Sequence, residues 1–191
     1  APEGSFLNPE SVPAVDTTEA LPPAPSINEH GLQVESIRVA RNVAHHFPQV
    51  TTIGGWRESD PYPDHPSGRA VDVMIDNYST PEGAALGDDI AKFLQEHAVE
   101  LGIEYLLWDQ KSWYAGQPHD AWKPMEDRGG DTANHLDHVH VTVTNGGGYP
   151  TEATQYLSAG AVGTNVSHHQ PQGNVVRPDS PAAKSDLPGL L

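Results

Sequence analysis

A turn and a short strand within residues 64–75 join two potential metal ligands, His65 and Asp72. Gly68 permits a tight turn, and the residues after it predict a strand. Alternate side chains of a strand point to opposite faces, so Asp72 shares one face with its neighbours at positions 70 and 74. The other face carries the residues that we expect in the core: Val71, Val73 and Ile75.

Asp72 is therefore a carboxylate in the middle of an otherwise apolar strand. A buried charge without a partner is costly, so this side chain requires a counter-charge. A metal ion satisfies that requirement, and His65, seven residues earlier, favours this interpretation. A salt bridge or a structural hydrogen bond is the alternative.

Residues 138–143 predict a second strand, with His138 and His140 on one face and three valines on the other. Two histidines on the same face can bind one ion together, or one can bind while the other handles protons. Together with His65 and Asp72 they form a compact set of imidazole and carboxylate ligands, which is typical of zinc sites.

Only part of the chain has the composition of a packed core. The 191 residues are 36% hydrophobic and include 18 prolines and 18 glycines, many of them towards the two ends. Residues 1–27 are rich in proline and acidic side chains and contain neither Lys nor Arg. We therefore expect a disordered N-terminal segment at 1–27, a domain at 28–150 and a mostly disordered tail at 151–191.

Charge and residue usage exclude several classes of function. The formal net charge of −16 argues against a non-specific nucleic-acid binder, because neutralising phosphates requires Lys and Arg. Without cysteine the chain has neither disulfides nor thiolate ligands, so a metal must be held by His, Asp, Glu or backbone oxygen. No stretch of the sequence is long and apolar enough to span a bilayer.

The first residues of the sequence indicate a processed secreted chain. They form a proline-rich acidic run without the basic and apolar segments of a signal peptide. We therefore expect a secreted or cell-envelope location, and we favour a monomer.

Hydrophobic spacing predicts an α+β fold. Apolar residues at intervals of three and four predict helices over residues 27–46 and 81–101, the second with Thr80 as its N-cap and with Gly102 after its end. Further strands are expected at 50–53 and 103–108, and a long polar loop at 115–134. About four strands and two helices suit a small antiparallel sheet with helices packed against it.

Arg57 follows the strand predicted at 50–53 and precedes the turn that carries His65. An arginine beside a metal site can hold an anionic or carbonyl oxygen of a substrate. A surface ion pair is an equally good interpretation of this residue from the local sequence.

The two motifs resemble those of a known zinc peptidase group. The pattern His65-x-x-Gly68-x-Ala70-x-Asp72 and the later His138-x-His140 resemble the motifs shared by lysostaphin-type enzymes, D-Ala-D-Ala metallopeptidases and the hedgehog signalling domain. The chain looks closest to the D-Ala-D-Ala carboxypeptidase-like branch of secreted actinobacterial proteins, in which a segment such as residues 54–57 precedes the first motif. The resemblance covers about residues 29–144, and it implies a small antiparallel sheet with packed helices.

The resemblance also implies roles for individual residues. The zinc ligands would be His65, Asp72 and His140. His138 would handle the proton or stabilise the transition state, and Arg57 would grip the substrate.

His135 is a further active-site candidate. It resembles the extra histidine of the penicillin-insensitive murein endopeptidase arrangement. The sequence departs from the group at Pro63, where a serine is frequent, and it lacks the Glu-x-x-His version of the second motif, which supplies a glutamate base in the dipeptidases.

The function that this resemblance implies is a secreted zinc peptidase, either D-Ala-D-Ala carboxypeptidase-like or murein endopeptidase-like. It would hydrolyse peptide bonds in peptidoglycan stem peptides through a zinc-activated water. One alternative is a catalytically silent, zinc-containing extracellular module that binds a cell-wall or protein partner. Another is an interaction domain in which His65 and Asp72 form a metal-free structural pair.

Overall fold

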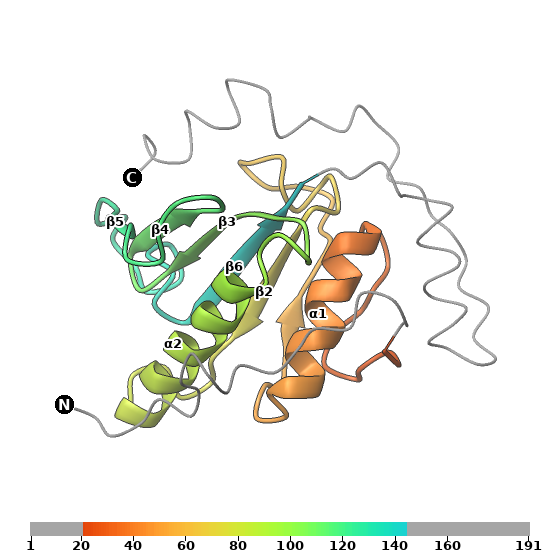
Figure 1. The fold of residues 1–191 in the computed structure, drawn as a ribbon, viewed down its shortest axis with the longest axis horizontal. Coiled ribbons are helices and arrows are strands. Elements are labelled where there is room, and N and C mark those ends of the chain that lie inside the picture. The colour runs from red at the N-terminus through yellow and green to blue at the C-terminus, as the bar shows by residue number, and fades with distance from the viewer. Residues whose placement is uncertain (1–20, 145–191) are drawn as a thin grey trace.

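The computed structural model describes residues 21–144, which form two helices and a six-stranded sheet (Figure 1). The elements are α1 (Val34–His46), β1 (Ile53–Gly54), β2 (Ala70–Met74), α2 (Pro81–Glu96), β3 (Ile103–Trp108), β4 (Lys111–Tyr114), β5 (Lys123–Pro124) and β6 (His138–Val143). None of the helices in this range is long and apolar enough to cross a membrane. The disordered segments predicted for the two ends lie largely outside the described residues.

The sheet has the strand order β1-β2-β6-β3-β4-β5, and every neighbouring pair is antiparallel. The prediction of an α+β fold with a small antiparallel sheet is therefore confirmed. The last strand of the domain, β6, lies at the centre between β2 and β3. This placement brings the two sequence motifs side by side, although they are about seventy residues apart.

Both helices pack on one face of the sheet, and the core lies between them and the strands (Figure 1). The valines of β2 and β6 that were predicted to face inward are fully buried there: Val71, Val73, Val139, Val141 and Val143. The alternate side chains of the same strands lie on the opposite face of the sheet. That face carries Asp72, His138 and His140.

The helices are shorter than the hydrophobic spacing predicted. α1 begins at Val34 rather than residue 27, because Ile27 forms a bridge with Ile53, Gly31 has a φ of 77° and Gln33 is extended. At the start of α2 the predicted N-cap is confirmed, since Thr80 Oγ1 accepts a hydrogen bond from the N–H of Gly83. α2 ends at Glu96 rather than near residue 101, and turns lead to Gly102, which has a φ of 67°.

The strands also differ in length from the prediction. The strand expected at 50–53 is reduced to Ile53–Gly54, and the long loop expected at 115–134 contains the short strand β5. A tight turn at Asp109 and Gln110, both with positive φ, folds β4 back onto β3. Positive φ at both central residues is typical of a two-residue hairpin turn.

Residues 21–27 contact the domain instead of leading away from it. Ile27 forms an isolated parallel bridge with Ile53, and the Arg41 guanidinium donates a hydrogen bond to the carbonyl of Leu21. The boundary predicted at residue 27 therefore falls inside a packed segment.

The close packing of α2 against β3 can be tested by substitution of Gly87, which contacts Trp108. A Cβ atom at Gly87 would lie 2.0 Å from Cζ2 of Trp108, whose indole is anchored by a 2.8 Å hydrogen bond to Asp88. Overpacking typically costs about 1–3 kcal/mol, and an overlap this deep with an anchored ring should lie in the upper part of that range, above the roughly 1 kcal/mol that alanine gains over glycine in a helix. Gly87→Ala should therefore lower the urea midpoint of unfolding.

Gly130→Ala is the matched control, because an added Cβ at this position would meet no atom within 4 Å. Equal midpoints for the two variants would contradict the packing described for Trp108.

Candidate metal centre

The register of the central strands brings two of the candidate ligands together. Asp72 on β2 lies directly opposite His140 on β6, and its Oδ1 is 2.8 Å from Nδ1 of His140. His65 approaches from the turn before β2 and places its Nε2 3.1 Å from Asp72 Oδ2. One ligand atom from each of the three residues lies within 4.8 Å of the others, and all three side chains are buried.

The turn that presents His65 is held by the backbone. The N–H of Gly68 donates to the carbonyl of His65, and the N–H of Arg69 donates to the carbonyl of Asp64. Gly68 has a φ of +73°, and a Cβ at this position would lie 2.2 Å from the carbonyl oxygen of Gly31. Both the conformation and the close approach therefore require glycine three residues after the histidine.

The orientation of His65 is fixed by its other ring nitrogen. Nδ1 lies 2.8 Å from the carbonyl oxygen of Gly55. Because a carbonyl only accepts, Nδ1 carries the proton in this contact. Nε2 is buried and faces Asp72, with 3.1 Å between Nε2 and Oδ2 of that carboxylate. It is thus positioned as a ligand atom.

The three groups fit a metal ion in charge and in spacing. Burial alone would raise the pKa of Asp72, but hydrogen bonds from His140 and His65 outweigh it and hold the pKa well below its usual value. The site therefore contains a buried carboxylate anion. Ligand atoms around a tetrahedral zinc ion at 2.0–2.1 Å lie roughly 3.3 Å apart, close to the separations observed at Asp72. These buried groups can therefore hold a metal ion.

His138 lies next to the three candidate ligands, and one of its two ring nitrogens contacts Asp137. Its Nε2 is 3.7 Å from Asp72 Oδ1, and its Nδ1 is 2.6 Å from Asp137 Oδ1. Asp137 in turn accepts a 2.6 Å hydrogen bond from Thr132. Although partial burial alone would raise the pKa of Asp137, the hydrogen bonds from Thr132 and His138 lower it. Asp137 is thus an acceptor that directs Nε2 of His138 towards the ligands.

His135 has an unusual backbone conformation and lies beside His138. It adopts a φ of 55°, which is unusual for a residue other than glycine, and its ring centroid lies 4.7 Å from that of His138. Burial, followed by the charges of His140 and His138, lowers its pKa to about 2, so the imidazole is neutral. His135, His138 and His140 form a second group whose ligand atoms lie within 4.8 Å, so the same ion could recruit a fourth ligand.

These residues line a cavity of about 230 Å³ on the face of the sheet opposite the helices. Arg57 stands at its edge with a half-exposed side chain, its Nε 2.7 Å from Asp60 and its Nη1 3.5 Å from Asp72 Oδ2. Arg128 contributes a second cation to the lining and lies 5.8 Å from the ring centroid of Tyr62. The cavity therefore combines potential ligands with two guanidinium groups.

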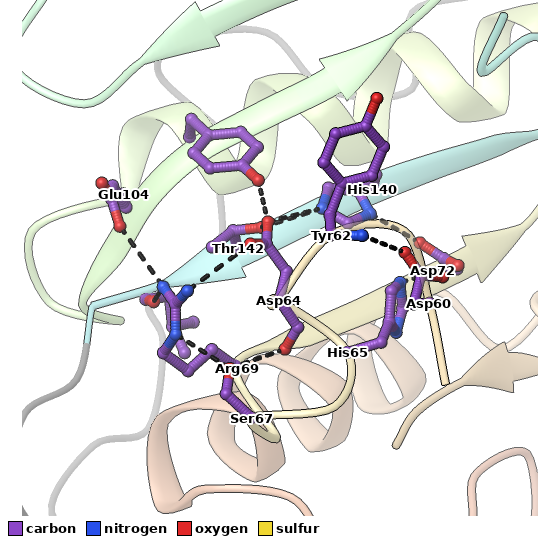
Figure 2. Close-up of polar contacts among 12 residues, drawn as sticks. Asp60, Tyr62, Asp64, His65, Ser67, Arg69, Asp72, Glu104, His140 and Thr142 are labelled. Carbon is purple, nitrogen blue, oxygen red and sulfur yellow. Dashed lines mark hydrogen bonds and ion pairs between the residues drawn. The ribbon is translucent and has the colours of Figure 1, made fainter. Parts of the chain in front are cut away.

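A buried polar network lies behind His140 (Figure 2). Its Nε2 is 2.8 Å from Thr142 Oγ1 and 3.7 Å from Asp64 Oδ2. Thr142 Oγ1 is 2.7 Å from the same Asp64 oxygen, to which the Tyr105 hydroxyl also donates. Arg69, almost fully buried, lies 3.4 Å from the other oxygen of Asp64.

The structure brings all six candidate residues from the sequence to this one cavity: Arg57, His65, Asp72, His135, His138 and His140. His119 does not contribute, since it lies on an exposed loop beside Glu96, and His45 is exposed at the end of α1. Four further residues of the site were not predicted from the sequence: Asp64, Asp137, Arg128 and Thr142. Of these four, only Thr142 could have been found from the sequence, because it lies two residues after His140 on the same strand and therefore on the same face of the sheet.

Comparison with known families gives one match. The family model described as VldE, C-terminal domain matches residues 28–136, more than half of the chain. The chain belongs to this family. No curated protein and no solved structure gives a significant match. In this member of the VldE C-terminal domain family, the matched range includes Arg57, His65, Asp72 and His135 and ends before His138 and His140.

The metal-free site predicts a pH dependence of folding stability. Burial alone would lower the pKa of His140, but hydrogen bonds with Asp64 and Asp72 raise it to about 9. Its usual value is about 6.5. A group whose pKa is raised in the folded state stabilises that state. The stabilisation by His140 is complete below about pH 6.5 and is lost as the pH rises through about 9. Urea unfolding in chelator should therefore show stability falling across this window.

His140→Gln should flatten this dependence, whereas the exposed His45→Gln should keep it. The same slope in His140→Gln and in the unmodified chain would show that another group is responsible.

Proposed function

We propose that this chain is a secreted or cell-envelope zinc peptidase that hydrolyses peptide bonds in peptidoglycan stem peptides. The observation that carries the proposal is the convergence of His65, Asp72 and His140 at one end of a cavity that also contains His138. The choice of substrate rests on the resemblance of the two sequence motifs to the zinc peptidase group.

The donor set supports a catalytic rather than a structural metal. Three residues would hold the ion, through Nε2 of His65, the carboxylate of Asp72 and Nδ1 of His140. Three protein ligands with an open fourth position are typical of catalytic zinc. When bound, zinc supplies a Lewis acid and lowers the pKa of water to about 7.

His138 is the residue best placed to move protons. Its Nδ1 is held by Asp137, so the lone pair of Nε2 faces the ligands and can accept a proton from the attacking water. The same nitrogen can then donate that proton to the leaving amine. Asp137 keeps the ring in this orientation and stabilises the imidazolium that forms in between.

Arg57 is suited to stabilise the oxygen that becomes negative as the carbonyl is attacked. Its guanidinium contacts Asp60 through Nε and Asp72 through Nη1. The terminal nitrogens therefore lie on the cavity side of the guanidinium. Arg128 can hold a substrate carboxylate on the Tyr62 side of the cavity. Together they favour a peptide with an anionic group near the scissile bond.

Two histidine variants test the division of roles. His140→Ala should lose both zinc and activity, because it removes a ligand. His138→Ala should keep one zinc per chain and lower the turnover of muropeptides by about 10²–10⁴-fold, the usual contribution of a general acid or base. Zinc content is measured by elemental analysis and turnover by chromatography, with exposed His45→Ala as the control.

Full activity in His138→Ala would overturn its proposed role. Loss of zinc in that variant would instead identify His138 as a fourth ligand that closes the site.

Digestion of purified peptidoglycan tests the function directly. The zinc-loaded chain should release new amino and carboxyl termini within stem peptides, and a chelator should abolish the release until zinc is added back. Mass analysis of the products identifies the bond. No cleavage by a fully zinc-loaded chain, together with tight binding to the same material, would replace the peptidase by a binding module.

A further inference from the structure

The side of His140 that faces away from the proposed metal is fully enclosed by polar groups. Nδ1 points to Asp72, whereas Nε2 lies 2.8 Å from Thr142 Oγ1. Thr142 is completely buried and Asp64 is only 2% exposed. Solvent therefore has no part in satisfying Nε2, and the protonation of this nitrogen is decided by the protein.

The available protons determine the donor and the acceptor in each hydrogen bond around Asp64, Thr142 and His140. Asp64 Oδ2 accepts from the Tyr105 hydroxyl and lies 2.7 Å from Thr142 Oγ1, while Arg69 faces Oδ1. A carboxylate accepts only, so the single hydroxyl proton of Thr142 points to Asp64. The hydroxyl oxygen is then left to accept from His140, and Nε2 must carry a proton.

We propose that the buried relay Asp64–Thr142–His140 is a positioning device, which holds a proton on Nε2 of His140 and thereby presents Nδ1 as the metal ligand. This proposal rests on the metal site of the proposed function, and it adds residues that neither sequence motif contains. Metal-binding histidines commonly donate their second N–H to an acceptor, which fixes the ring and raises the basicity of the ligand nitrogen.

The surroundings keep Asp64 in the form that the relay needs. Oδ1 of Asp64 lies 3.4 Å from the buried guanidinium of Arg69, and Oδ2 accepts from the hydroxyls of Thr142 and Tyr105. Arg69 is itself placed by Ser67 Oγ at 3.0 Å and by Glu104 at 3.6 Å (Figure 2). The carboxylate is thus charge-paired on one oxygen and available as an acceptor on the other.

Substitution of Thr142 separates this role from simple packing. Thr142→Val keeps the shape but removes the acceptor, whereas Thr142→Ser keeps the hydroxyl. Tyr105→Phe is the matched control, because it removes another hydrogen bond to the same Asp64 oxygen and keeps the ring that stacks on His140. Zinc affinity of the full chain is measured by competition with a chromophoric chelator, and the protonation of His140 by long-range ¹H–¹⁵N NMR of the zinc-loaded protein.

Thr142→Val should bind zinc about 10–100-fold more weakly, the usual effect of losing such a partner, while Thr142→Ser and Tyr105→Phe stay near the unmodified chain. The unmodified chain should show a proton on Nε2 of His140. Equal affinities for Thr142→Val and Tyr105→Phe, or a proton on Nδ1 of zinc-loaded His140, would overturn the proposal.

The same measurements distinguish this proposal from the proposed function. Loss of zinc affinity in Thr142→Val, in a chain that cleaves no peptidoglycan, would support the relay and reject the peptidase. Failure of the unmodified chain to bind zinc at all would overturn both.

Discussion

The cross-strand pair of Asp72 and His140 is the interaction on which the rest of the site depends. These residues face each other on neighbouring antiparallel strands, with 2.8 Å between Oδ1 and Nδ1. The strands are held in this register by the valines on their opposite face, which are fully buried against the helices. A shift of one residue would move the ligands into the core and the valines into the cavity. The packing of the core therefore defines the geometry of the site.

Charge compensation explains why so many ionisable groups are buried in so small a space. Asp64 and Asp72 lie on either side of His140, and Arg69 faces Asp64 from the far side. In the absence of a metal, a protonated His140 balances the two carboxylates, which is why its pKa rises to about 9. A divalent cation would replace that proton on Nδ1 and leave the one on Nε2. The fold thus accommodates either a proton or a metal at the same position.

The sequence predicts the candidate site better than it predicts the edges of the fold. Alternation in β2 and β6 placed Asp72 and His140 on one face and the valines on the other, because period-two patterns follow directly from strand geometry. The ends of helices depend on tertiary contacts, which the spacing of apolar residues in the sequence does not reveal. The start of α1, for example, depends on Gly31, whose carbonyl lies against Gly68 thirty-seven residues later. Arg128 and Asp64 were missed for the same reason, since only tertiary contacts show that they face the site.

The contact between the turn of residues 64–69 and α1 gives the first helix a part in the chemistry of the site. The carbonyl of Gly68 accepts hydrogen bonds from the N–H of Gln33 and from Ser36 Oγ, at 2.9 and 2.7 Å. The turn that carries His65 is therefore fastened to the N-terminal end of a helix on the other side of the sheet. A displacement of that helix would move one ligand relative to the two on the strands. The position of the beginning of α1 therefore affects the geometry of the proposed metal site, although none of its residues lines the cavity.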